Sequence, residues 1–127
     1  MKKLLLFLLV LGAVQVKAQV VKGSIDMRDS TFTRSIPFEV PAGTKSVKYS
    51  VKVYAAAGEV TITLFDPNDK RATGFSIGTK IPGGGHEPSK GEIYDDVKPK
   101  TFGTWKFNVK AENATGTISY EIEVTKP

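Results

Sequence analysis

Few residues in this 127-residue sequence could do chemistry, and His86 is its only histidine. A Ser-His-Asp mechanism needs a histidine base that touches a nucleophile and is oriented by a carboxylate. Asp95 and Asp96 follow His86 within ten residues, but no strand-turn-helix elbow presents a serine to it. We therefore expect His86 to be a solvated loop residue, and we predict no catalytic residues and no enzyme.

Acidic side chains gather in two places and are the candidate metal ligands. Asp66 and Asp69 frame an Asp-Pro-Asn-Asp stretch, and Asp95 and Asp96 are adjacent. Calcium takes six to eight oxygens from carboxylates and carbonyls, so these four aspartates are the candidate calcium ligands. No D-x-D-x-D-G spacing is present, and turn residues in water are the simpler interpretation. One histidine and no cysteine exclude the usual zinc site.

Exposed aromatic side chains are the next candidates, because flat rings can stack on a ligand. Tyr54 and Phe65 fall on the polar face at the ends of expected strands, which makes them candidate contact residues. Trp105 alternates in step with Phe107 and Val109, so we expect it in the core.

The stretch from Lys80 to Gly91 is the longest irregular segment and contains three consecutive glycines before His86 and Glu87. A phosphate-binding loop would continue with Gly-Lys-Ser/Thr into a helix, and this stretch does not. Loops of this length in small domains often carry function. We therefore add His86 and Glu87 to Tyr54 and Phe65 as candidate binding residues.

Period-2 alternation of apolar and polar residues dominates the chain from Val20 onward, and no helical spacing is sustained. Strong strands are expected at 46–53, 59–65, 104–109 and 118–124, and weaker ones at 20–25, 31–40, 75–77 and 93–94. This pattern predicts an all-β fold, a two-sheet antiparallel β-sandwich of jelly-roll type with about seven or eight strands.

Turn residues set the expected connections between these strands. Asp66–Asp69 ends one strand, and 112–116 is expected to be the turn of a hairpin that joins 104–109 to 118–124. Pro37 cannot donate a ladder hydrogen bond, so its strand should lie at a sheet edge.

The N-terminus is typical of an export signal, with Lys2 and Lys3 before an apolar run that ends near Val14. We expect residues 1–18 to be a cleaved signal peptide and 19–127 to form a single domain, secreted or periplasmic. The apolar run is shorter than the roughly 20 residues of a spanning helix, so no transmembrane anchor is expected in the mature chain.

Net charge argues against nucleic acid as a partner. The whole chain carries +5, from 18 basic and 13 acidic residues, but Lys2, Lys3 and Lys17 would leave with the signal. Fifteen basic residues then face 13 acidic ones, a net charge of +2. Binding to phosphates needs clustered cations, which so small an excess does not provide.

Two segments resemble a known family. The run Val60-Thr61-Ile62-Thr63-Leu64-Phe65-Asp66-Pro67, with Gly103-Thr104-Trp105 and the strands after it, is similar to bacterial pre-peptidase C-terminal domains and the related proprotein-convertase P-domains. The resemblance implies a jelly-roll-like sandwich that accompanies secreted enzymes, sometimes binds calcium and is not catalytic. Asn68 and Asp69 stand where that family commonly has glycine.

These features favour a secreted or periplasmic, non-enzymatic binding module for an extracellular glycan or an envelope protein. An accessory role beside a secreted enzyme is one form of this hypothesis. The alternative is a structural or assembly component of the cell surface or extracellular matrix. Size-exclusion chromatography tests the alternative, because a strict monomer at high concentration would contradict an assembly role.

Overall fold

The computed structural model describes residues 18–125, and these form strands and connecting turns without a helix. The five strands, in chain order, are β1 (Ala18–Val40), β2 (Ser46–Phe65), β3 (Arg71–Gly78), β4 (Ser89–Val97) and β5 (Gly103–Thr125). The protein is therefore all-β, as the alternation predicts.

All pairings in the sheet are antiparallel, and the strand order is β1-β5-β2-β3. β4 also pairs with β2, alongside its residues 47–55, whereas β3 lies alongside residues 59–65. β2 and β5 are thus interior strands, and β1 lies at one edge along its whole length.

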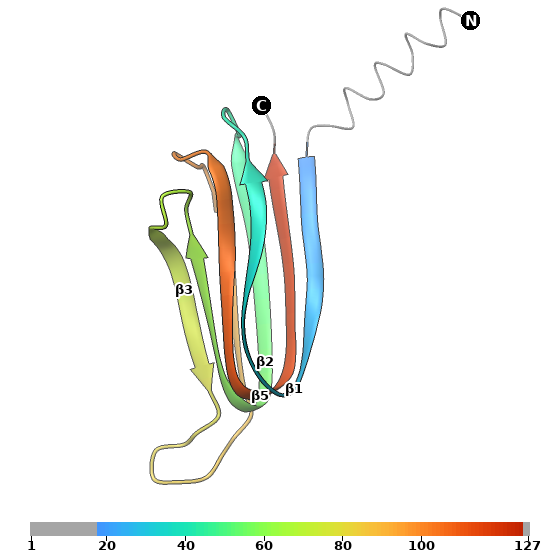
Figure 1. Cartoon of the computed structure of the whole chain (residues 1–127), viewed down its shortest axis with the longest axis vertical. Helices are drawn as coiled ribbons and strands as arrows, with labels where there is room; N and C mark the ends of the chain where they lie inside the picture. The colour runs from blue at the N-terminus through green and yellow to red at the C-terminus, as the bar shows by residue number, and fades with distance from the viewer. Residues whose placement is uncertain (1–17, 126–127) are drawn as a thin grey trace, which may run out of the picture.

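The three long strands bend sharply in the middle, at one end of the molecule (Figure 1). The ladder shifts register there, and each strand has a residue with a left-handed backbone at its bend: Asp29 (φ 48°), Gly58 (φ 86°) and Asn113 (φ 48°). Glycine, asparagine and aspartate adopt this conformation most readily, so these residues suit the bends.

The bends fold the sheet onto itself, so that two halves face each other. Layer one, as we name it, contains residues 18–27, 116–125, 46–55 and β4, in that order across the half-sheet. Layer two contains residues 32–40, 103–111, 59–65 and β3.

Alternate side chains of both layers fill the space between them. Tyr49 of layer one and Phe107 of layer two meet edge to face, with ring centroids 5.4 Å apart, and Phe38 lies 6.0 Å from Phe107. All three are buried. This aromatic contact joins halves that share no hydrogen-bonded ladder away from the bends.

The structure corrects two expectations. It has five strands and not seven or eight, and the hairpin with its turn at 112–116 is wrong, because β5 runs without interruption through this segment. Bulges and turns use the same residue types, and a sequence pattern does not show whether the chain reverses or only bends.

Other expectations are confirmed. Val47, Tyr49, Val51 and Val53 point inward; the strand with Pro37 lies at an edge; and the chain turns at Asp66. Trp105 is partly buried against the core, and its Nε1 donates a 3.0 Å hydrogen bond to the Thr101 carbonyl.

The expected signal peptide falls on residues 1–17, outside the described residues, apart from Ala18 at the start of β1. Its cleavage therefore stays a prediction. Within residues 18–125, no helix is long and apolar enough to cross a membrane.

Candidate functional site

The outer face of layer one carries three adjoining hollows, which we call the outer-face groove. Their volumes are about 440, 220 and 160 Å³, and neighbouring hollows share lining residues. The side chains on this face come from interior strands β2 and β5 and from β4. They are Lys48, Ser50, Lys52, Tyr54, Lys90, Glu92, Tyr94, Thr117, Ser119, Glu121 and Glu123.

Strand register explains the shape of the groove. Ser50 lies between Glu121 and Tyr94 on the neighbouring strands, and Lys52 lies between Ser119 and Glu92. Since residues directly opposite in a sheet point to the same face, the short serines leave room between longer neighbours. Small hydroxyl side chains therefore form the floor, and longer charged and aromatic ones form the walls.

Two tyrosines stand out from this face. Tyr94 is 68% exposed and Tyr54 44% exposed, the two highest values among the exposed aromatic side chains of the described residues. A tyrosine offers a flat apolar ring and a hydroxyl that donates and accepts hydrogen bonds. Rings that remain in water are available to a ligand.

Charges of both signs alternate across the groove. Lys48 lies between Glu123 and Asp96, and Lys52 faces Glu92. The two ion pairs within 4 Å among residues 18–125, Lys106–Asp69 and Lys110–Glu112, lie elsewhere. The ammonium and carboxylate groups of the groove therefore have hydrogen-bonding capacity to spare.

Tyr49 lines one hollow from below but belongs to the core. Burial raises the pKa of its phenol above the ordinary 10.0, and the Asp95 carboxylate on the paired strand raises it further. Both effects disfavour the phenolate. Tyr49 is therefore a neutral packing residue beneath the groove and not an acid–base group.

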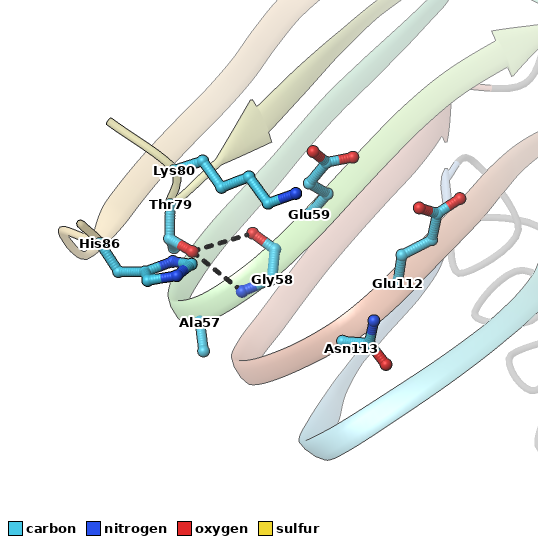
Figure 2. A pocket seen from close by; sticks show the side chains of 8 residues that line it. All are labelled: Ala57, Gly58, Glu59, Thr79, Lys80, His86, Glu112 and Asn113. Carbon is cyan, nitrogen blue, oxygen red and sulfur yellow. Dashed lines mark hydrogen bonds between the residues drawn. The ribbon is translucent and has the colours of Figure 1, made fainter. Parts of the chain in front are cut away.

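A separate hollow, of about 330 Å³, lies at the bends; we call it the bend pocket (Figure 2). Its wall includes the left-handed residues Gly58 and Asn113. The hydroxyl of buried Thr79 accepts a 3.0 Å hydrogen bond from the Gly58 amide and donates to the Gly58 carbonyl at 3.3 Å. The pocket is thus built on a hydrogen-bonded frame.

Glu59 and Glu112 lie directly opposite each other on β2 and β5 in the bend pocket, and Figure 2 shows Lys80 reaching toward Glu59. His86 contributes from the β3–β4 loop and is exposed. Residues 18–125 hold no group of three or more His, Cys, Asp or Glu that could bind a metal ion. The bend pocket thus has acidic, basic and imidazole groups without a metal cluster.

The loop before β4 is more regular than its glycines indicate. Lys80 and His86 pair as a β-bridge, and the Ile81 amide donates to the Gly85 carbonyl at 3.2 Å. The Glu87 amide donates to the Thr79 carbonyl at 2.8 Å. The three glycines form the tip of a small hairpin-like loop, as their positive φ angles of 93° to 112° permit.

The four predicted binding residues do not form one site. Tyr54 lines the outer-face groove, and His86 lines the bend pocket. Glu87 is exposed and lines another hollow, beside the loop. Phe65 is half-buried at the end of β2, where the Lys106 ammonium lies 5.9 Å from its ring centroid. Their roles in binding stay predictions.

The candidate calcium ligands have local roles. Asp66 accepts hydrogen bonds from the amides of Asn68 (2.8 Å) and Lys70 (3.0 Å). Asp69 pairs with Lys106 at 3.3 Å, and Asp95 accepts a 2.8 Å hydrogen bond from the Asp96 amide. These contacts stabilise a turn and a strand. Within residues 18–125 these aspartates belong to no group of three or more side chains that could bind a metal ion.

Tyr94 and the groove itself were missed at the level of sequence. Lys48 and Lys52 lie on β2, an interior strand that is paired on both sides. The alternation along β4, in which Ile93 points inward and Tyr94 outward, is the signal in the sequence that indicates a second exposed tyrosine. The register that sets Tyr94 beside Ser50 required the pairing of strands far apart in sequence.

Comparisons with known proteins add little beyond this geometry. No family model matches the chain, and no curated protein does. Among solved structures, similar folds include a pilus protein of Bacillus endospore appendages (TM-score 0.43, 13% identity, 87% of this chain and 90% of that one). A CBM4 structure matches with TM-score 0.43 and 11% identity, over 87% of this chain and 78% of that one. The infectious bursal disease virus VP2 subviral particle matches with TM-score 0.42 and 10% identity, over 87% of this chain and 33% of that chain.

Proposed function

We propose that this protein is an exported, non-enzymatic binding module that holds a glycan in the outer-face groove. The observation that carries the proposal is the groove itself, with Tyr54 and Tyr94 exposed beside a floor of Ser50 and Ser119. Ligand sites combine apolar surface with a few convergent polar groups, and this face offers both.

The chemistry of the groove favours a glycan over a protein. The core of a protein–protein interface is depleted of charged residues, whereas lysines and glutamates line this groove throughout. A sugar presents hydroxyls that can donate and accept, and serine, lysine and carboxylate side chains complement them. Its apolar C–H faces can stack on tyrosine rings.

The dimensions suit an extended ligand. Lys48 and Tyr54 bound the groove along β2, and six residues at a rise of ~3.3 Å span about 20 Å. The groove is open along this length. We therefore expect an oligosaccharide or a stretch of polysaccharide and not a monosaccharide.

A glycan array, followed by titration calorimetry with the best ligand, tests the proposal. Tyr54→Ala and Tyr94→Ala should each weaken binding by about fivefold or more, since a stacked aromatic contributes roughly 1 kcal/mol or more. Phe102→Ala is the matched control, because Phe102 is 41% exposed and does not line the groove. A glycan that binds the double tyrosine variant as tightly as the wild type would refute the proposal, as would an array blank with and without calcium.

Export is part of the proposal and has its own test. Mass spectrometry of the protein recovered from the periplasm or medium should give a chain that starts at Gln19.

We also propose the jelly-roll classification. The order of half-strands in each layer supports it, with 18–27, 116–125, 46–55 and β4 over 32–40, 103–111, 59–65 and β3. The pre-peptidase resemblance stays a hypothesis.

A further inference from the structure

The open edge of layer one is the first half of β1. Within the described residues, β1 pairs with β5 on one side, and no strand pairs with its other side. Such an edge presents a row of unpaired backbone amides and carbonyls that another strand can complete. Residues 19–27 contain no proline, and Val20 is 50% exposed.

Symmetry limits how this edge can pair with a second copy. When two copies of a strand pair antiparallel about a twofold axis, the residue numbers of every opposed pair add up to the same sum. The two side chains of an opposed pair must also lie on the same face of the sheet. In β1, Lys22, Ser24 and Asp26 point outward, whereas Ile25 and Met27 are buried. The sum of the two residue numbers must therefore be even, and the axis passes midway between the two copies of one residue.

Charge then selects one register. An axis at Ser24 sets Lys22 of each copy opposite Asp26 of the other, giving two ion pairs and a Ser24–Ser24 contact at the centre. An axis at Lys22 or at Asp26 would place like charges directly opposite, which is unfavourable.

Two other edges, the second half of β1 and β4, are less suited to self-pairing. Pro37 lies in the second half of β1 and cannot donate a ladder hydrogen bond. β4 carries Glu92, Asp95 and Asp96 among its nine residues, with Lys90 as its one cation, so two copies would repel each other.

We propose that the protein forms a twofold dimer by antiparallel pairing of residues 19–27 of β1, centred on Ser24. The two copies of layer one then form one continuous sheet of eight half-strands. Because the axis is perpendicular to the sheet, both outer-face grooves open on the same side. The inference does not depend on a glycan being the ligand, but it makes a repetitive ligand bivalent.

Charge exchange tests the register. On the chain from Gln19 onward, sedimentation velocity over a concentration series should show a reversible monomer–dimer equilibrium, weak because so short an interface is small. Lys22→Asp and Asp26→Lys each replace two attractive pairs by two repulsive ones, and should weaken the dimer by about tenfold or more. The double variant K22D/D26K restores both pairs and should dimerise like the wild type.

A matched control separates pairing from stability. Lys48→Asp places an acid beside Glu123 on β5, just as Lys22→Asp places one beside Glu121, but Lys48 is on an interior strand. It should leave the dimer unchanged. A wild-type chain that is monomeric at millimolar concentration would overturn the proposal, and so would a double variant no more dimeric than the single ones.

A cysteine variant gives a second, independent readout, because the chain has no cysteine. Opposite residues in an antiparallel pair have Cα atoms about 4.5 or 5.5 Å apart, within disulfide range. Ser24→Cys should therefore cross-link to a dimer under mild oxidation. Ser35→Cys, on the same edge strand beyond the bend, should cross-link much more slowly, and equal rates would contradict the register.

Discussion

At the scale of single residues, Tyr49 shows how the core and the candidate groove share one side chain. Its ring packs edge to face on Phe107, and it is 4% exposed, yet it also lines a hollow of the outer face. Its phenol lies near the Asp95 carboxylate on the next strand. A buried phenol beside an acid resists ionisation, and that resistance is measurable.

Alkaline pH should therefore destabilise the fold through Tyr49. The folded pKa is raised, so the folded state keeps its proton at pH values where the unfolded chain, with an ordinary value of 10.0, loses it. The stability is present below that pH and falls as pH rises through the unfolded and folded values. Urea unfolding should show that the free energy of unfolding falls less between about pH 9 and pH 11 for Tyr49→Phe than for the wild type.

Asp95→Asn provides the companion test, because it removes the second cause of the shift. The absorbance titration of Tyr49, taken as the difference between wild type and Tyr49→Phe, should move to lower pH in the Asp95→Asn background. An equal alkaline fall in wild type and Tyr49→Phe would contradict the assignment.

Sequence predicts single residues well where alternation alone decides. Tyr54 was identified because its parity in a strong strand is clear, and it lies exposed in the groove. Tyr94 was not, because β4 is short and its importance comes from the neighbours that pairing gives it. His86 and Tyr54 belong to different hollows, and sequence spacing could not separate them.

At the scale of elements, the bends decide the architecture. The Asp29 amide donates a 3.0 Å hydrogen bond to the Thr115 hydroxyl, and the Asn113 amide donates a 2.9 Å bond to the Thr31 hydroxyl. These cross-strand bonds join the bends of β1 and β5. The Asn-Ala-Thr triplet at 113–115, which matches an N-glycosylation pattern, therefore has a structural role in the fold.

Gly58→Ala should destabilise the protein more than an ordinary glycine substitution. Gly58 has φ +86°, and an added Cβ would collide with the carbonyl oxygen of Asn113 on β5. Strain and displacement together should cost about 3 kcal/mol of unfolding free energy. Chemical denaturation measures the loss.

Gly84→Ala is the matched control for this bend. Gly84 also has a positive φ, +112°, but an added Cβ would meet nothing within 4 Å. Gly84→Ala should lower the free energy of unfolding by only about 1 kcal/mol, the cost of a positive φ at a residue other than glycine. If both variants lose the same stability, the contact between β2 and β5 at the bend is unimportant.

The same bends explain why strand count and hairpin were mispredicted whereas the apolar faces were not. Inward residues are set by period-2 alternation, which continues on either side of a bulge. Residues 55–58 and 112–116 have the small and polar residues of turns, but hydrogen bonds to neighbouring strands carry the chain onward there. Those partners are distant in sequence, so local pattern could not reveal them.

At the scale of the whole molecule, one folded sheet has to behave as a single cooperative unit. Layers one and two are continuous through three bends, and their facing side chains form one buried cluster. Phe107 is central to it, because it contacts Tyr49 across the layers and Phe38 within its own layer. Loss of its ring should therefore weaken both layers together.

Phe107→Ala should lower the free energy of unfolding by about 3–5 kcal/mol, the usual cost of truncating a buried aromatic. Phe102→Ala, at a side chain 41% exposed, should change it by about 0.5 kcal/mol or less. Hydrogen exchange is the decisive measurement, because a cooperative sheet should lose protection equally at amides of β4 in layer one and β3 in layer two. Loss confined to layer two would mean that the layers unfold separately, and that the groove on layer one can persist without the other half of the sheet.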